Sequence, residues 1–191
     1  MKLTQVIKEA RSCRECATYL PEGPRPLFQV SSASRLVIIG QAPGAVAHES
    51  GVPWDDASGR RLRDWLGVTD EVFYEAKQVA LMPMGFCYPG KGGSGDLAPR
   101  QECAPLWHPG MLSGMKKLRL TLLIGRYAME RYLPGRYRAI TEAVADYEAL
   151  LPDRLVLPHP SPRNNIWLKK NSWFEKKLVP RLRTTIAKAL A

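Results

Sequence analysis

The residues best suited to chemistry lie in the stretch 154–165, directly after a short apolar run. The run Leu155–Leu157 is typical of a strand buried in an α/β sheet. His159 follows it, held between prolines that continue neither a helix nor a strand ladder. Open α/β sheets bind ligands at the carboxyl ends of their strands, so we expect a site here that also includes Ser161, Arg163 and Asn164. The alternative is a proline-rich turn whose histidine caps a helix or faces solvent.

A glycine-bounded turn follows the clearest apolar run of the chain, Arg35–Gly40, which predicts a second buried strand. Two glycines let the backbone approach a ligand closely. The spacing matches neither the phosphate-binding P-loop nor the GxGxxG of dinucleotide-binding proteins, so no nucleotide cofactor is expected. The residues of this turn are Gly40, Gln41, Ala42, Pro43 and Gly44.

A third group of candidates precedes a predicted helix at 58–67. Trp54 lies in a proline-bounded loop, where its ring can stack on a planar ligand or belong to the core. Asp55 and Asp56 follow it directly, at the edge of a possible pocket. Their alternative role is to stabilise the start of a helix through its dipole. Ser58 is the predicted N-cap of the helix, which is expected to end at Gly67.

The chain has four cysteines, Cys13, Cys16, Cys87 and Cys103. Disulfides are not expected, because no secretion signal is evident. Zinc ribbons use two C-x2-C pairs, and the second pair here is spaced too widely for that. Four thiolates from distant segments can hold a [4Fe–4S] cluster, and buried free thiols are also common. The spacing leaves cluster, zinc and no metal open.

Strands and helices must alternate to position these residues. Such alternation predicts an α/β fold, with a parallel sheet covered by helices on both faces. The length of 191 residues favours one domain, 1–191. We expect strands near 35–40, 79–82, 118–125 and 154–157, and helices near 3–10, 58–67, 69–77, 126–132, 138–150 and 171–190. We also expect a mobile or ligand-ordered loop at 88–95, and a helix from about 99 that Pro105 and Pro109 interrupt.

The net charge of +10, from 28 Lys and Arg against 18 Asp and Glu, suggests a polyanionic partner. Nucleic acid is the first candidate, and a merely solubilising surface is the alternative. Trp167, Trp173 and Phe174 are interleaved with the C-terminal cations, which suits phosphate contacts with base stacking or an amphipathic helix. No run approaches the ~20 apolar residues that span a bilayer, so we expect a cytoplasmic protein without a membrane partner.

Taken together, these motifs resemble those of the uracil-DNA glycosylase superfamily. The turn 40–44 and the stretch His159-Pro-Ser-Pro162 are similar to its motifs A and B. Gly51-Val-Pro-Trp54 and Ser58-Gly59 lie where its iron–sulfur branch has G-x-P-F and A/S-G. The cysteine spacing is similar to the quartet on which that branch carries a [4Fe–4S] cluster. The resemblance spans most of the chain, from Cys13 to the C-terminal helix.

The resemblance implies a three-layer α/β/α sandwich around a four-stranded parallel sheet. It also implies a monofunctional enzyme of base-excision repair, which hydrolyses the N-glycosidic bond of uracil in DNA and leaves an abasic site. The base must then be flipped from the duplex or taken from a single strand. The rival hypotheses are a catalytically weak relative acting as an iron–sulfur nucleic-acid-binding module, and a hydrolase of nucleotides or small N-glycosides. The basic, tryptophan-rich C-terminus argues against the latter.

The same resemblance implies the role of each residue. Neutral His159 would donate a hydrogen bond to the departing uracil oxygen, worth about 3 kcal/mol. Backbone N–H groups of Gln41–Gly44 would shape the pocket, and Trp54 would stack on the base. Ser161 would bind a phosphate that flanks the lesion. Arg163, where many relatives insert a leucine, would fill the vacated stack and grip phosphate.

Two positions depart from the family pattern. Ala42 stands where the most efficient relatives have the aspartate that positions water, although the iron–sulfur branch also has alanine there. Asp55 and Asp56 are the possible substitutes. Pro83 stands where iron–sulfur relatives have an asparagine that reads the uracil edge. Base discrimination then falls to Asn164 or to backbone groups, and we expect looser selectivity that includes xanthine or 5-hydroxymethyluracil.

Overall fold

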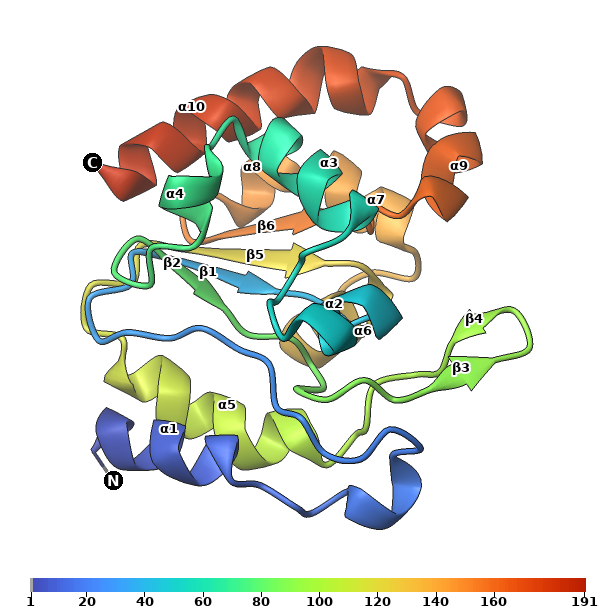
Figure 1. Cartoon of the computed structure of the whole chain (residues 1–191). Helices are drawn as coiled ribbons and strands as arrows, with labels where there is room; N and C mark the ends of the chain where they lie inside the picture. The colour runs from blue at the N-terminus through green and yellow to red at the C-terminus, as the bar shows by residue number, and fades with distance from the viewer. Residues whose placement is uncertain (1) are drawn as a thin grey trace.

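A four-stranded parallel sheet forms the centre of the computed structural model, which describes residues 2–191 (Figure 1). Its strands lie in the order β2 (Val79–Leu81), β1 (Leu36–Ile39), β5 (Leu120–Ile124) and β6 (Arg154–Leu157), and every neighbouring pair is parallel. Only Thr121 and Arg154 among the strand residues are not buried. Continuous apolar strands of this kind are typical of a sheet covered on both faces. The predicted fold class is confirmed.

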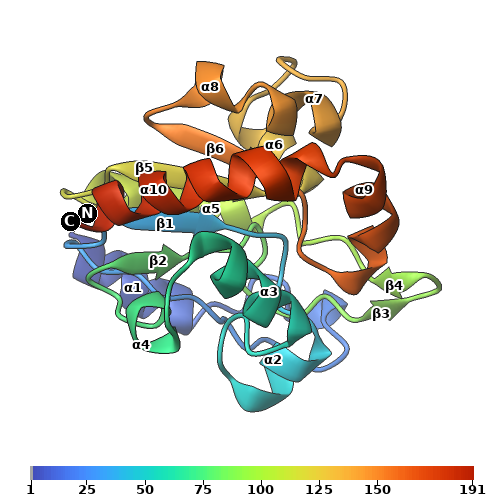
Figure 2. The same ribbon diagram turned by 90° about the horizontal axis from the view of Figure 1, so that it is seen from above.

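Two pairs of helices cover the two faces of the sheet (Figure 1). On one face α10 (Val179–Leu190) packs beside α3 (Ala57–Leu66) and crosses β1. On the other face α1 (Leu3–Arg11) packs against α5 (Cys103–Gly114). Figure 2 shows α10 lying along the sheet from above. The other helices are α2 (Ala45–Ser50), α4 (Asp70–Phe73), α6 (Arg126–Tyr132), α7 (Ile140–Ala145), α8 (Tyr147–Leu150) and α9 (Asn165–Lys170).

Several helix boundaries differ from the predicted ones. Helix α4 has one turn instead of extending to residue 77, and the predicted helix 138–150 divides at Asp146 into α7 and α8. The expected interruption of α5 is wrong: Pro105 lies in the first turn, where no intrahelical N–H is required, and Pro109 is accommodated inside the helix. The C-terminal segment adds α9 and a π-helical turn at Phe174–Leu178 before α10.

The C-terminal aromatic residues face the interior more than they face solvent. Phe174 is fully buried and meets the ring edge of Trp65 at a centroid distance of 4.8 Å. Trp167 is half-buried and donates its indole N–H to the Thr141 hydroxyl at 2.8 Å. These residues therefore form an amphipathic packing face, while Lys169 and Lys170 between them remain exposed. Within residues 2–191, no helix combines the length and the apolar character that crossing a membrane requires.

The glycine-rich segment near 88–95 is not the loop that we expected. It forms an antiparallel hairpin of β3 (Lys91–Gly92) and β4 (Gly95–Asp96). The hairpin projects beyond the carboxyl ends of the parallel strands, toward α9 (Figures 1 and 2). The Arg163 side chain donates to the carbonyl oxygen of Ser94 at 2.8 Å, so the tip of the hairpin is attached to the segment that follows β6.

A buried histidine joins α5, α6 and the segment after β2. His108 is 2% exposed, and its Nε2 lies 3.0 Å from the carbonyl oxygen of Pro83. Because a carbonyl only accepts, Nε2 carries the proton and Nδ1 accepts from the Tyr132 hydroxyl at 2.6 Å. Burial lowers the pKa of His108 to about 4 and raises the pKa of Tyr132 to about 12. Both groups are therefore neutral at neutral pH.

We expect His108 to make the fold sensitive to mild acid. Its pKa lies below the ordinary 6.5, so the unfolded chain takes up this proton first as the pH falls. The contribution of neutral His108 to the free energy of unfolding is complete above about pH 6.5 and is lost as the pH falls toward 4. The free energy of unfolding then decreases by about 3 kcal/mol. Denaturant unfolding at several pH values should show a flatter pH dependence in His108→Gln than in the wild type. The same exchange at His48 controls for the substitution, and parallel curves for all three proteins would contradict this role.

Candidate active site

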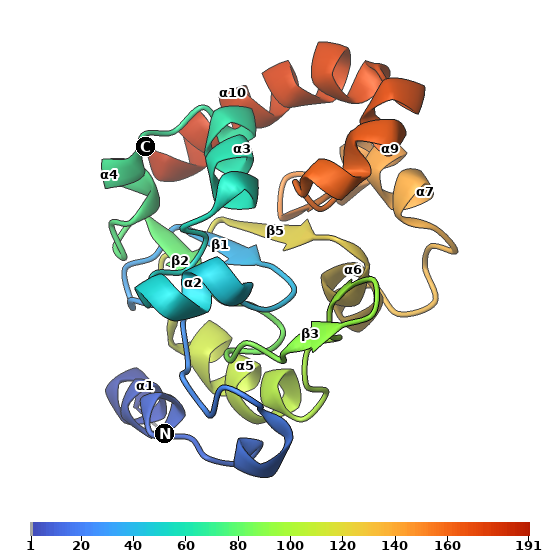
Figure 3. The same ribbon diagram turned by 45° about the vertical axis from the view of Figure 1, so that its right-hand side comes forward.

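A cleft of about 350 Å³ opens at the carboxyl ends of the parallel strands, the ends that face the viewer in Figure 3. The chain passes from β1 outward to β2 and then returns to the other side of β1 as β5, so the strand order reverses between β1 and β5. Such reversal points are the usual ligand sites of open α/β sheets. Four segments form most of the lining, namely the turn 41–44, residues 53–58, the hairpin end 96–97 and the stretch 159–164, and Ala47 and Pro83 complete it.

His159 lies in this cleft as a neutral hydrogen-bond donor. Its Nδ1 accepts the backbone N–H of Ser161 at 3.2 Å, so the proton of the neutral ring resides on Nε2. Burial lowers the pKa of His159, and the carboxylates of Asp56 and Asp96 oppose that shift. The Asn164 side chain also donates to the His159 carbonyl at 2.7 Å, which fixes the backbone. The expected position of this histidine at the sheet edge is confirmed.

Trp54 stacks beside His159 and lines the same cleft. Their ring centroids are 5.8 Å apart, with 28° between the ring planes. The indole also lies against Gly40, where an added Cβ would come within 2.6 Å of a ring carbon. Gly40 does not line the cleft itself but supports the ring that does. Trp54 also packs against the hydrophobic core, so it belongs to the core and lines the cleft at once.

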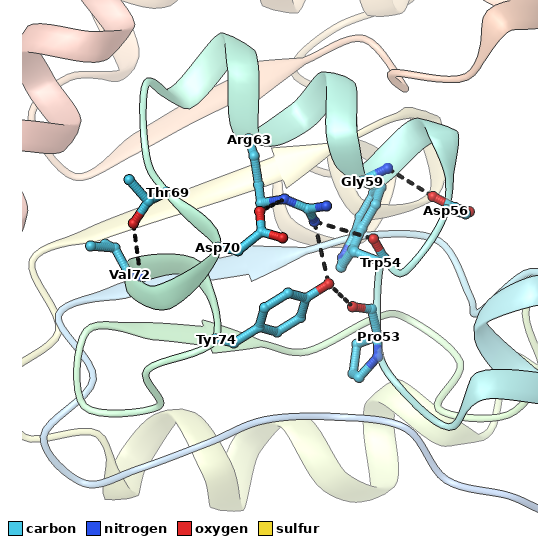
Figure 4. A network of polar contacts seen from close by, with 9 residues as sticks. All are labelled: Pro53, Trp54, Asp56, Gly59, Arg63, Thr69, Asp70, Val72 and Tyr74. Atoms are coloured by element: carbon cyan, nitrogen blue, oxygen red, sulfur yellow. Dashed lines mark hydrogen bonds and ion pairs between the residues drawn. The ribbon is translucent and has the colours of Figure 1, made fainter.

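Buried Arg63 holds Trp54 in an unusual backbone conformation (Figure 4). Trp54 has φ 61°, in the left-handed region that costs a non-glycine residue about 1 kcal/mol or more. The Arg63 guanidinium donates to the Trp54 carbonyl and to the Tyr74 hydroxyl, both at 3.3 Å, and Tyr74 donates to the Pro53 carbonyl at 3.1 Å. Its charge is paired with Asp70 at 2.6 Å. Two of these contacts hold the loop at its backbone carbonyls, and the other two hold Arg63 and Tyr74 in place.

Asp56 is the N-cap of α3, and the expectation of Ser58 in that role is wrong. The Asp56 carboxylate accepts the Gly59 N–H at 2.7 Å (Figure 4), and the helix begins at Ala57. Its extended backbone, with φ −151°, places the side chain for that bond. Asp56 still lines the cleft, as does Ser58. Asp55 is exposed and is not among the lining residues.

The polar residues after His159 hold the site together. Ser161 accepts the Arg163 N–H through its hydroxyl oxygen at 3.3 Å, and its carbonyl accepts from Arg61 of α3 at 3.3 Å. The guanidinium of Arg163 extends to the hairpin and packs against Gly95. Ser161, Arg163 and Asn164 all line the cleft, as predicted.

Asp96 is the lining residue that the sequence did not reveal. It lies at the end of β4, and its Oδ2 is 3.4 Å from the position that a Cβ on Gly44 would occupy. Its Oδ1 receives the Tyr88 hydroxyl at 3.4 Å. Asp96 ends a glycine-rich segment that matches no known motif, so no sequence pattern indicated its role. The folding of the hairpin brings Asp96 into the cleft that His159 lines.

The four cysteines line a second, smaller cavity of about 30 Å³ together with apolar residues such as Phe86 and Trp107. Burial raises the pKa of the Cys87 thiol to about 11 and that of Cys103 to about 12. Among residues 2–191, no group of three or more His, Cys, Asp or Glu is arranged to hold a single metal ion. The four thiols thus converge on one largely apolar space.

The chain was compared with known families and structures. The model of the Uracil DNA glycosylase superfamily matches residues 28–183. Cys13 and Cys16 lie outside the matched range. A solution NMR structure of a "putative Uracil DNA glycosylase" from Methanosarcina acetivorans shares 17% sequence identity, with a TM-score of 0.48 over 84% of this chain and 98% of that chain. A structural likeness this remote does not bear on activity.

Gly59→Ala should be strongly destabilising. An added Cβ would come within 1.8 Å of the Trp54 carbonyl oxygen, so the loop and the helix cannot both keep their places. We expect a loss of about 2 kcal/mol or more in the free energy of unfolding. Thermal melting with tryptophan fluorescence measures it. Gly93→Ala is the matched control, because a Cβ there meets no atom within 4 Å, and equal losses in both variants would refute the packing argument.

Proposed function

Because this chain belongs to the uracil DNA glycosylase superfamily, we propose that it is a monofunctional DNA glycosylase, which hydrolyses the N-glycosidic bond of uracil and leaves an abasic site. The observation that carries this proposal is the fixed tautomer of His159. With Nδ1 occupied by the Ser161 N–H, the ring offers an Nε2–H donor to the cleft. A preorganised neutral donor suits a base that leaves as an anion.

In the proposed reaction the bond between the base and C1′ of the deoxyribose breaks, and its electron pair goes to the base. The Nε2–H of His159 stabilises the negative charge that develops on the uracil oxygen. Lowering of the His159 pKa by burial keeps the ring neutral, so it donates a hydrogen bond without adding a positive charge. Water then supplies the hydroxyl group at C1′, and a proton is released.

The DNA itself would be held by the positive surface and by the stretch 161–164. Ser161 uses its hydroxyl oxygen as an acceptor toward Arg163, so the hydroxyl hydrogen is free to donate to a phosphate. Trp54 offers a ring on which an extruded base can stack. The net charge of +10 favours a polyanionic substrate over a free nucleoside.

We further propose that the enzyme accepts related damaged bases such as xanthine or 5-hydroxymethyluracil. Pro83 lines the cleft without a side-chain amide, and its carbonyl is occupied by His108. Asn164 already donates to the His159 carbonyl. Gln41 lines the cleft, and its side-chain amide can both donate to and accept from a base edge.

The second candidate function is a catalytically weak relative that binds nucleic acid. Ala42 favours it, because a methyl group lines the cleft at the place of the aspartate in efficient relatives. Such a protein would bind DNA with a steep salt dependence but would leave the glycosidic bond intact.

We also propose that Cys13, Cys16, Cys87 and Cys103 hold a [4Fe–4S] cluster. The convergence of the four thiols on one cavity supports this assignment. When bound, the cluster would supply a cross-link of four thiolate bonds and no step of the hydrolysis. Cys13 and Cys16 follow α1, Cys87 lies in the segment after β2, and Cys103 begins α5, so the cluster would link these three segments.

His159→Ala should reduce uracil excision by about a hundredfold or more, because the departing base loses its hydrogen-bond donor. Alkali-dependent strand cleavage of a uracil-containing oligonucleotide under single-turnover conditions measures the rate. His48→Ala, a histidine outside the cleft, is the matched control. Unchanged cleavage by His159→Ala would remove this mechanism. If the wild type cleaves neither single nor double strands, the binding-module function is favoured.

Protein purified without oxygen should contain iron and acid-labile sulfide in similar amounts and show the broad visible absorption of iron–sulfur centres. Cys103→Ser should lose both, because the cluster would lose one of its four thiolate ligands. Ser12→Ala, beside Cys13, controls for a neighbouring exchange. Stoichiometric zinc, or colourless protein without iron, would contradict the cluster.

A further inference from the structure

The β3–β4 hairpin brings a carboxylate into the cleft beside Gly44, at the end of the turn 41–44. Asp96 ends the hairpin, and its Oδ2 borders the open side of Gly44. Asp96 and His159 line the same cleft. Asp56, which caps α3, lines this cleft as well, so two carboxylates share the space with the ring of His159. A carboxylate and a hydrogen-bond donor therefore face the same space.

The hairpin that carries Asp96 contacts the segment after β6 that carries His159. Arg163 donates to the Ser94 carbonyl at 2.8 Å and packs on Gly95, where a Cβ would come within 1.7 Å of the guanidinium. The other end of the hairpin closes through the Leu97 N–H, which donates to the Gly90 carbonyl at 2.9 Å. The hairpin and the segment after β6 are therefore held as one unit.

The charge of the cleft differs from that of the whole chain. The chain has a net charge of +10, yet the charged residues lining the cleft are Asp56, Asp96 and Arg163. Two carboxylates repel the phosphates of a nucleic acid, which is a cost for a protein that must bind DNA. That cost is offset if positive charge develops between them, as it does on a deoxyribose ring when its glycosidic bond breaks.

The two carboxylates are not equally free. Asp56 uses Oδ1 to cap α3, through the Gly59 N–H at 2.7 Å. The only hydrogen bond of the Asp96 side chain within residues 2–191 is the long contact with Tyr88 at 3.4 Å, which leaves its Oδ2 available. Ala42 offers no polar atom beyond its backbone to a water molecule. Asp96 is thus the less committed acceptor beside Gly44.

We propose that Asp96 binds the attacking water and accepts its proton as the hydroxyl oxygen bonds to C1′. The C1′–N bond breaks in the same reaction, its electron pair leaves with the base, and the base regains a proton from solvent. Asp96 then releases the accepted proton to solvent, so the net reaction adds the hydroxyl group of one water to the sugar and one proton to the base. This assignment rests on the glycosylase activity proposed above.

The test compares three charge-removing variants on the same uracil-containing oligonucleotide. Asp96→Asn should reduce the single-turnover rate by about a hundredfold, the usual contribution of a general base. The single-turnover rate of Asp56→Asn should fall less, because asparagine can also cap the helix. Asp153→Asn, an exposed carboxylate at the opposite end of β6, is the matched control and should cleave like the wild type. Thermal melting checks that each variant is folded.

Two further measurements separate a proton acceptor from a structural role. Affinity for an oligonucleotide with non-cleavable 2′-fluorodeoxyuridine should be unchanged or tighter in Asp96→Asn, because a negative charge near the phosphates is removed. Added formate should restore part of the rate of Asp96→Ala, since the small anion can take the place of the carboxylate.

The outcomes distinguish this assignment from the activity on which it rests. An active wild type with an equally active Asp96→Asn overturns the role of Asp96 and leaves the glycosylase intact. A severe loss in Asp56→Asn beside a mild loss in Asp96→Asn transfers the role to Asp56. Loss in Asp96→Ala without formate rescue, together with weakened DNA binding, shows a structural role instead. A wild-type protein that excises no base from single-stranded or double-stranded DNA overturns both proposals.

Discussion

All four strands of the sheet are parallel and buried on both faces, and this constraint decides where chemistry can occur. Because helices cover both faces of the sheet, nearly all side chains along these strands are apolar. Polar residues therefore gather where the strands end, and all four strands end at the same edge. The reversal of strand order between β1 and β5 opens a cleft at that edge. The catalytic proposals follow from this geometry.

A buried cation maintains one wall of that cleft. Arg63 is 7% exposed, and an uncompensated charge at such a place is costly. Asp70 pairs with it, and its guanidinium lies over the rings of Phe73 and Tyr74 at 5.2 and 5.5 Å. Because the same group binds the Trp54 carbonyl, satisfying the charge also keeps that loop in its left-handed conformation. Stability of α3 and the placement of the tryptophan are consequently linked.

The cleft combines neutral and charged groups in a way that suits cleavage of a bond between a base and a sugar. His159 is neutral because burial lowers its pKa, and it faces the part of the cleft where an anionic leaving group is expected. Asp56 and Asp96 border Gly44, where a positive sugar ring is expected. Opposite charges that develop in the proposed reaction would thus meet complementary groups in one cleft, and the net positive charge of the chain favours phosphate binding.

The sequence alone determined the four strands and the place of His159 after the last of them. Apolar runs and the prolines that interrupt them are local signals. Its motifs also indicated the family. Only the tertiary structure decided that Asp56 caps α3, that residues 91–96 form a hairpin, and that Asp96 reaches the cleft. Local patterns record burial and backbone preference, whereas the meeting of side chains from β4, α3 and the end of β6 depends on long-range packing, which no short pattern encodes.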